Sequence, residues 1–181
     1  QPNTTIIDAC AGAGGKTLHL ASLLHNQCTL LAYDSDAAKL AELQKRAHRN
    51  GAKVQICANN SLQPLWETTW YQKADRLLLD VPCTGLGTLK RRPDIKWKLT
   101  PTTANQLIQA QAQLLNRYSN LLKSGGIAVY ATCSILPQEN NLQIEQFVKQ
   151  QQGRFILLAE NHIWPSETGF DGFYMAKLLK T

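Results

Sequence analysis

The sequence has 181 residues, which is enough for one globular domain with a substantial core and too few for two. Hydrophobic residues make up 44% and charged residues 18%, a balance that excludes a disordered chain, and the longest apolar runs are far too short to cross a bilayer. The formal net charge of +6 favours a polyanionic partner only weakly, because many ordinary enzymes are mildly basic. We therefore expect one folded domain that does not enter a membrane.

The cysteines indicate reduced thiols and no metal site. No two of the five are spaced as Cys-x-x-Cys, and none pairs with a histidine at zinc-ligand spacing. Their odd number, in a sequence whose start shows no signal-peptide pattern, predicts a cytoplasmic protein. Cys28 and Cys57 lie in apolar runs and are expected in the core, whereas Cys83 and Cys133 lie in a different setting. The four histidines have no partner at ligand spacing and are expected to be structural.

Apolar periodicity predicts alternating strands and helices along the chain. Short apolar runs predict strands at residues 4–7, 29–33, 54–58, 76–79, 127–131, 155–159 and 173–179. Helical spacing predicts helices at residues 16–25, 36–50, 103–123 and 137–151. Asp36 can cap the second helix, and Asn50 with Gly51 can end it. This alternation predicts an α/β fold with a mostly parallel, doubly wound, Rossmann-like sheet covered by helices on both faces.

Ligands bind such sheets beyond the carboxyl ends of the strands. A glycine-rich segment, residues 8–17, follows the first predicted strand and precedes a helix. It fails the P-loop template, because Cys10 stands where a glycine is required, and it fails the dinucleotide template at Thr17. The glycine-rich turn of a methyltransferase remains, with Asp34 after the second strand placed to accept hydrogen bonds from two ribose hydroxyls. A tight turn without a ligand is the alternative.

Two further loops each carry a cysteine. Residues 80–87 follow the fourth predicted strand, and residues 131–134 follow the fifth. Strands four and five are usually neighbours in doubly wound sheets, so Cys83 and Cys133 are expected to face one crevice. Either thiol alone could be buried and inert, but the pair favours chemistry.

These motifs, in this order, resemble those of the Sun/Fmu family of RNA cytosine-5 methyltransferases. The segments that carry the resemblance are Asp-x-Cys-Ala-x-x-Gly-Gly-Lys-Thr at 8–17, Asp-x-Pro-Cys at 80–83 and Thr-Cys-Ser at 132–134. Residues 90–97, 138–140 and 171–173 also resemble the bacterial ribosomal RNA branch, and the likeness runs from about residue 6 to residue 180. The resemblance implies a class I S-adenosylmethionine-dependent methyltransferase domain over residues 1–181, a fragment that lacks the family's N-terminal RNA-binding region.

The resemblance also implies a set of cofactor-binding residues. They are Cys10, Ala11, Gly12, Ala13, Gly14, Gly15, Lys16, Asp34, Asn60 and Asp80. Two positions depart from the family pattern. Gly12 and Ala13 replace the usual Ala-Pro, and Asn60 replaces an acid that the family places near the adenine amino group. An asparagine oxygen can still accept a hydrogen bond there.

By the same resemblance, Cys133 is the nucleophile that adds to carbon 6 of cytosine, and Cys83 assists release of the product. Asp80 is expected to bind either the cofactor amine or the cytosine ring. The expected substrate is small-subunit ribosomal RNA, and the expected protein is a monomer. Transfer RNA methylation and a non-catalytic RNA-binding or assembly role are alternatives. DNA cytosine methylation, in which Cys83 would attack, is disfavoured by the Thr-Cys-Ser motif.

A basic cluster surrounds an aromatic side chain, Trp97. Its members are Lys90, Arg91, Arg92, Lys96 and Lys98. Such a cluster can grip phosphates and stack a base, and a solvated loop is the alternative reading.

Overall fold

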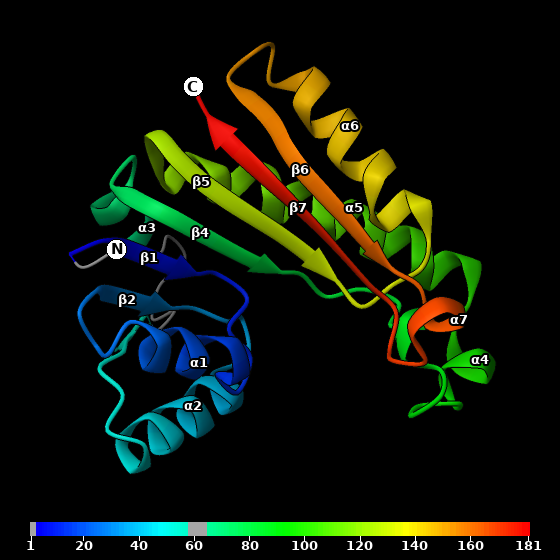
Figure 1. The fold of residues 1–181 in the computed structure, drawn as a ribbon, viewed down its shortest axis with the longest axis horizontal. Coiled ribbons are helices and arrows are strands. Elements are labelled where there is room, and N and C mark those ends of the chain that lie inside the picture. The colour runs from blue at the N-terminus through cyan, green and yellow to red at the C-terminus, as the bar shows by residue number, and fades with distance from the viewer. Residues whose placement is uncertain (1–2, 58–64) are drawn as a thin grey trace.

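The computed structural model describes residues 3–57 and 65–181 and contains one seven-stranded sheet (Figure 1). The strand order is β3-β2-β1-β4-β5-β7-β6. The strands are β1 (Thr5–Asp8), β2 (Thr29–Ala32), β3 (Gln55–Ile56), β4 (Ala74–Asp80), β5 (Leu122–Thr132), β6 (Phe155–Ile163) and β7 (Phe173–Lys180). β1 to β5 pair in parallel, whereas β7 is antiparallel to both β5 and β6. The mostly parallel α/β sheet expected from the sequence is therefore confirmed.

Helices connect the strands and pack on the sheet. They are α1 (Gly15–Leu23), α2 (Ala37–Arg49), α3 (Leu65–Trp70), α4 (Ile95–Lys98), α5 (Pro101–Tyr118), α6 (Asn141–Gln150) and α7 (Pro165–Thr168), with 3-10 turns η1 (Leu86–Thr88), η2 (Ser119–Leu121) and η3 (Pro137–Glu139). Asp36 caps α2 as predicted, because its Oδ1 accepts from the backbone N of Ala38 at 2.9 Å. Gly51 follows the helix with φ +64°, a conformation that glycine adopts without strain. None of the helices in the described ranges is long and apolar enough to cross a membrane.

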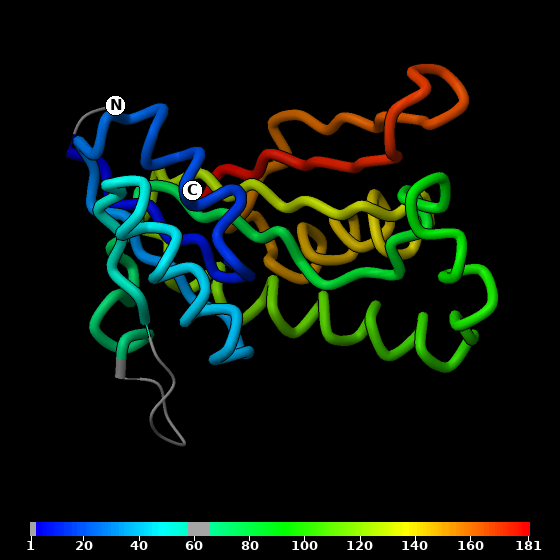
Figure 2. The backbone as a smooth tube through the Cα atoms, turned by 90° about the horizontal axis from the view of Figure 1, so that it is seen from below, coloured from blue at the N-terminus to red at the C-terminus, as the bar shows by residue number. Residues whose placement is uncertain are grey.

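The two faces of the sheet are covered unequally. Ile7 faces the main core, which α3, α5 and α6 cover with side chains such as Leu115 and Phe147. Ile6 faces the opposite side, where α1 and α2 pack over β1, β2 and β3. Beyond these strands the second face carries no helix in the described chain (Figures 1 and 2). On β6, Ile156 lies between Phe155 and Leu157, which pack on the main core, and is itself 47% exposed. The expected covering of both faces is thus complete only over the first three strands.

Several element boundaries differ from the sequence prediction. The helix expected at 103–123 ends at Tyr118, and β5 begins at Leu122 rather than at residue 127. Leu122 already pairs with Ala74, and the ladder shifts register before Arg76, so the glycines at 125 and 126 lie within the strand instead of before it. The third strand is limited to two residues within the described part, and the three short helices α3, α4 and α7 were not predicted.

Candidate active site

A cavity of about 410 Å³ opens at the edge of the sheet where the parallel strands end. The glycine-rich turn after β1, the acid after β2 and the loops after β4 and β5 all contribute to its wall. Of the residues proposed from the sequence, those that line it are Cys10, Gly12, Asp34, Asp80, Cys83, Arg92 and Cys133. Sequence reasoning missed further lining residues, namely Ala9, Tyr33, Ser35, Lys39, Val81, Pro82, Thr84, Gly85, Ile95, Leu114 and Tyr118.

The glycines of the turn serve different purposes. Gly12 has φ +54°, and a Cβ added to it would meet no protein atom within 4 Å, so a side chain there would project into open space. Gly14 has φ +87°, and an added Cβ would lie 2.1 Å from Cδ1 of Leu43 in α2. Gly12 therefore leaves room at the cavity, and Gly14 allows α1 and α2 to pack closely.

Three other turn residues, Ala11, Ala13 and Gly15, are not among those that line the cavity. The backbone N of Ala11 donates to the carbonyl of Tyr33 at 2.9 Å, and the carbonyl of Ala13 accepts from Arg46 at 2.6 Å. Gly15 is the first residue of α1. Asn60 lies outside the described residues.

Asp34 stands opposite the glycine turn and fits the diol of the expected cofactor. Its Oδ2 accepts from the backbone N of Gly12 at 2.8 Å, and its Oδ1 accepts from the backbone N of Asp36 at 2.9 Å. A carboxylate has about four lone-pair positions, so each oxygen retains capacity for a second donor. Two ribose hydroxyls are donors of the required kind, and the open space at Gly12 leaves room for them.

A second acid, Asp8, is buried beneath the turn. Its Oδ2 accepts from the hydroxyl of Thr17 in α1 at 2.7 Å, while its buried Oδ1 has no hydrogen-bond partner among the described residues. Burial raises the pKa of Asp8 from 3.8 to about 6. The side chain thus ties the end of β1 to the first turn of α1.

An ion pair joins the turn to the loop after β4. Lys16 Nζ pairs with Asp80 Oδ2, and both side chains are partly exposed. The same ammonium lies 5.9 Å from the ring centroid of Phe173 at the start of β7. Lys16 is not among the residues that line the cavity, but it holds Asp80, which is.

The two thiols meet as the sequence predicted. Cys83 Sγ lies 3.3 Å from Cys133 Sγ at the wall of the cavity. A hydrogen bond from Cys83 lowers the pKa of Cys133 from 9.0 to about 7, whereas the same bond and burial raise the pKa of Cys83. Cys133 is therefore the thiol that ionises first, and a thiolate is the nucleophilic form.

A buried polar cluster supports these loops. It comprises Thr84, Gln111, Ser134, Glu139 and Asn140, all less than 8% exposed. Its members come from four separate segments, so no local sequence pattern predicts the cluster. The sequence motifs include Thr84 in the loop 80–87, Ser134 in Thr-Cys-Ser, and Glu139 and Asn140 in Gln-Glu-Asn, but they do not predict that these residues meet, and Gln111 belongs to none of them.

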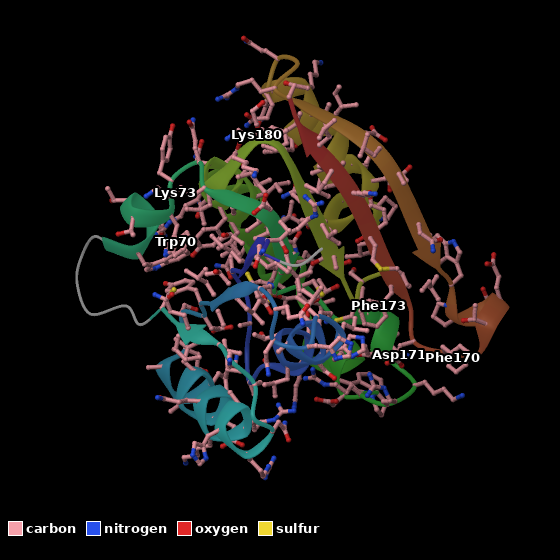
Figure 3. All side chains as sticks on the ribbon, turned by 60° about the vertical axis from the view of Figure 1, so that its left-hand side comes forward. Trp70, Lys73, Phe170, Asp171, Phe173 and Lys180 are labelled. Atoms are coloured by element: carbon pink, nitrogen blue, oxygen red, sulfur yellow. The ribbon has the colours of Figure 1, made fainter. Side chains whose placement is uncertain are left out.

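The basic cluster lies at the same end of the sheet. Trp97 is 83% exposed, and Arg92 reaches the wall of the cavity. Arg91 pairs with Asp171, which lies beside the exposed Phe170 in the connection from β6 to β7 (Figure 3). Lys98 forms an ion pair with Asp94 at 2.9 Å. Lys90 and Lys96 form no ion pair with a described residue.

No group of three or more His, Cys, Asp or Glu side chains within residues 3–57 and 65–181 could hold a metal ion. Of the histidines, His162 stacks on Trp164 with ring centroids 5.5 Å apart, which is a packing role. Cys57 is buried in the main core as expected, and Cys28 is partly buried beside Ala21 and Leu30.

Comparison with family models matches residues 1–179 to the model described as 16S rRNA methyltransferase RsmB/F. Among curated proteins, a probable ribosomal RNA small subunit methyltransferase B from Synechocystis sp. is 38% identical over 99% of this chain and 44% of its own length. The ribosomal RNA small subunit methyltransferase B of Pasteurella multocida is 39% identical over 97% of this chain and 42% of its own. The chain thus spans less than half the length of these relatives.

Two solved structures are also similar to this chain over nearly its whole length. NSun6 from Pyrococcus horikoshii, solved with the ligand SFG, has a TM-score of 0.85 and 27% identity over 98% of this chain and 48% of its own. A methyltransferase homologue from Pyrococcus horikoshii has a TM-score of 0.83 and 28% identity over 100% of this chain and 63% of its own.

Proposed function

Because the chain belongs to the 16S rRNA methyltransferase RsmB/F family, we propose that it is the catalytic domain of an S-adenosylmethionine-dependent RNA cytosine-5 methyltransferase acting on small-subunit ribosomal RNA. The contact between Cys83 and Cys133 at the cavity wall is the observation that carries the chemistry. Because the proposed substrate is ribosomal RNA, we also propose that the protein acts in the cytoplasm.

Gly12 and Asp34 bind the cofactor in this proposal. Asp34 accepts hydrogen bonds from the ribose hydroxyls, and the open face of Gly12 lets the backbone approach the ligand. The bound cofactor supplies an electrophilic methyl group. Asp80 lies between the turn and the thiol loops and accepts a hydrogen bond from the cofactor amine or from the exocyclic amino group of the cytosine, while Lys16 holds it in place.

Carbon 5 of cytosine is a weak nucleophile, and Cys133 overcomes this. Its thiolate forms a bond to carbon 6 as the double bond between carbons 5 and 6 opens, and the displaced electron pair makes carbon 5 electron-rich enough to take the methyl group. The electrons of the bond that the methyl group leaves stay on the cofactor sulfur. The hydrogen bond from Cys83 supports this step, since it lowers the pKa of Cys133 to about 7 and so increases the thiolate fraction at neutral pH.

Release requires the reverse cleavage. A base removes the proton from carbon 5, electrons return to the ring, and the bond between Cys133 and carbon 6 breaks. Cys83, in contact with the departing sulfur, assists this step. The proposed RNA path runs from the cavity over Arg92 toward the exposed Trp97, where a phosphate contact and base stacking are both available.

Methyl transfer from radiolabelled S-adenosylmethionine tests the proposal. The gene product that carries this chain is incubated with ribosomal RNA, transfer RNA and DNA of matched concentration, and nucleosides are analysed by mass spectrometry. We expect 5-methylcytosine in ribosomal RNA. Label in transfer RNA would show that transfer RNA, and not ribosomal RNA, is the substrate. Label in DNA would contradict the RNA assignment. Cofactor binding without any methyl transfer would favour a non-catalytic RNA-binding role.

A further inference from the structure

A buried polar cluster lies beneath the two thiols, and the mechanism above makes no use of it. Glu139 is 0% exposed, and the adjacent Asn140 is 1% exposed. A carboxylate at this depth is costly unless hydrogen bonds replace its lost hydration. Its donors therefore identify which parts of the fold it connects.

The donors to Glu139 hold the loop that carries Cys83. The backbone N of Thr84 donates to Oε1 at 2.9 Å, and the Thr84 hydroxyl donates to Oε2 at 2.5 Å. Gln111 Nε2 in α5 donates to the same Oε1 and to the carbonyl of Pro82, both at 2.9 Å. Pro82 and Thr84 flank Cys83, so the carboxylate holds that cysteine's backbone directly on one side and through Gln111 on the other.

Asn140 makes the equivalent contacts to the other thiol loop. The hydroxyl of Thr132 donates to Asn140 Oδ1 at 2.6 Å, and Asn140 Nδ2 donates to the carbonyl of Ser134 at 3.0 Å. Thr132 and Ser134 flank Cys133. Two consecutive residues, the last of η3 and the one that precedes α6, thus hold the two cysteine loops, one loop each.

A pair of hydroxyls links the two halves of the cluster. Thr84 Oγ1 lies 3.1 Å from Ser134 Oγ. A carboxylate only accepts, so the Thr84 hydroxyl donates to Glu139, and the Ser134 hydroxyl must then donate to Thr84. The hydroxyl of Tyr130 donates to the main-chain carbonyl of Glu139 at 2.7 Å, which anchors the cluster to β5.

We propose that Glu139 and Asn140 are positioning residues that clamp Cys83 and Cys133 at contact distance. The inference rests on the proposed function, because thiol spacing matters only if the pair reacts. Neither residue lines the cavity, so they act through the cysteines and not on the substrate. Hydrogen bonds weaken steeply with distance, so a loosened clamp deprives the Cys133 thiolate of its donor.

The test uses this chain alone and needs no RNA. The rate of iodoacetamide alkylation at Cys133 is followed by peptide mass spectrometry across pH, and we expect a midpoint near 7 in the parent chain. Glu139→Gln places an amide opposite the two Thr84 donors. We expect the midpoint to move toward 9.0, the value from which it is lowered in the parent, and a full return lowers the thiolate fraction at pH 7 by about 50-fold.

A matched pair guards against a folding defect in that variant. Thr84→Val keeps the side-chain shape but removes the hydroxyl that links Glu139 to Ser134, whereas Thr84→Ser keeps the hydroxyl. We expect a raised midpoint in the first and the parent midpoint in the second. Glu145→Gln, an exposed carboxylate change on α6, is the control and leaves the midpoint in place. A parent midpoint in Thr84→Val overturns the proposal, whatever Glu139→Gln does.

Methylation by the whole gene product separates the two proposals. Loss of the clamp is expected to lower kcat while leaving KM for RNA unchanged. A shifted alkylation midpoint in a protein that never methylates RNA would refute the proposed function and leave the clamp standing. Normal methylation by Glu139→Gln with an unshifted midpoint would refute the clamp alone.

Discussion

The glycine-rich end of the cavity and its thiol end are held in place by different kinds of contact. At the glycine-rich end, backbone groups position the acid. The backbone N of Gly12 donates to one carboxylate oxygen of Asp34, and the backbone N of Asp36 donates to the other. At the thiol end, side chains from distant segments hold the loops, with Glu139 at the centre. The difference shows that local backbone geometry is enough to position an acid at the cavity wall, whereas the two cysteine loops are positioned by side chains from distant parts of the fold.

The cysteines themselves give the largest expected effect. Cys133→Ala removes the attacking sulfur, so we expect neither methylated RNA nor a covalent adduct. Cys83→Ala leaves attack possible but impairs release, so a protein–RNA adduct is expected to accumulate. Denaturing electrophoresis of both variants with RNA and cofactor reads this directly. An adduct in Cys133→Ala would reverse the two roles, and normal turnover in both would remove the thiol end from the chemistry altogether.

At the glycine-rich end, the acid Asp8 is buried, and its effect on stability depends on pH. Its pKa in the folded chain, about 6, lies above the ordinary 3.8, so the stability it contributes is full below pH 4 and is lost as pH rises through 6. The loss amounts to about 3 kcal/mol. Asp8→Asn should remove this decline, measured as the difference from the parent in the free energy of urea unfolding between pH 4 and 7. Exposed Glu42→Gln is the control; a parent-like decline in Asp8→Asn would count against the burial effect.

Adding one methyl group at each end tests the comparison directly. A Cβ on Gly87 would lie 2.2 Å from the carbonyl oxygen of Gly172 and 2.8 Å from that of Cys133, so Gly87→Ala should destabilise the fold by about 2 kcal/mol. Gly12→Ala meets open space and should instead weaken cofactor binding, with a smaller loss of stability from its positive φ. Thermal unfolding and calorimetry with S-adenosylmethionine separate these effects. Equal losses of stability in both variants would erase the distinction between the ends.

The smallest effect is expected outside both ends, at Trp97. Removing one base-stacking ring costs about 1 kcal/mol, so Trp97→Ala should weaken RNA binding about fivefold without altering cofactor affinity. Tyr71→Ala, at a half-exposed aromatic before β4 and so at the opposite edge of the sheet, is the control. Equal RNA affinity in the parent and Trp97→Ala, measured by fluorescence anisotropy, would assign this tryptophan to a solvated loop.

The sequence predicts the two ends unequally well, for a physical reason. The glycine turn, Asp34 and the meeting of Cys83 with Cys133 follow from short motifs at the ends of parallel strands. The clamp does not, because Gln111 and Glu139 lie 28 positions apart and meet only after α5 and η3 have packed on the sheet. Polar residues at such positions look like ordinary helix surface until tertiary packing buries them.

Strand boundaries fail for a related reason. The two glycines at 125 and 126 are typical of a break before a strand, yet β5 runs through them because β4 pairs with it on both sides of a register shift. The apolar pattern also does not predict that one face of β5, β7 and β6 lacks a helix. Ile156 and Leu179 on that face have the side chains of buried strand residues. The extent of β5 and the position of β6 and β7 in the sheet depend on which strands pair, and not on local propensity.

The place of β7 has a consequence for how the domain is made. It is the last strand of the sheet in chain order, yet it lies between β5 and β6 instead of at an edge. During synthesis, β5 and β6 leave the ribosome with a gap that only the final strand can fill, and the open edge of β5 is exposed until then. Gly172, just before that strand, donates its backbone N to Gly87 O, and Gly87 N donates to Cys133 O. The loop that carries Cys133 thus receives this backbone support only after β7 has been synthesised, so a chain that stops before β7 is expected to expose the edge of β5 and to aggregate.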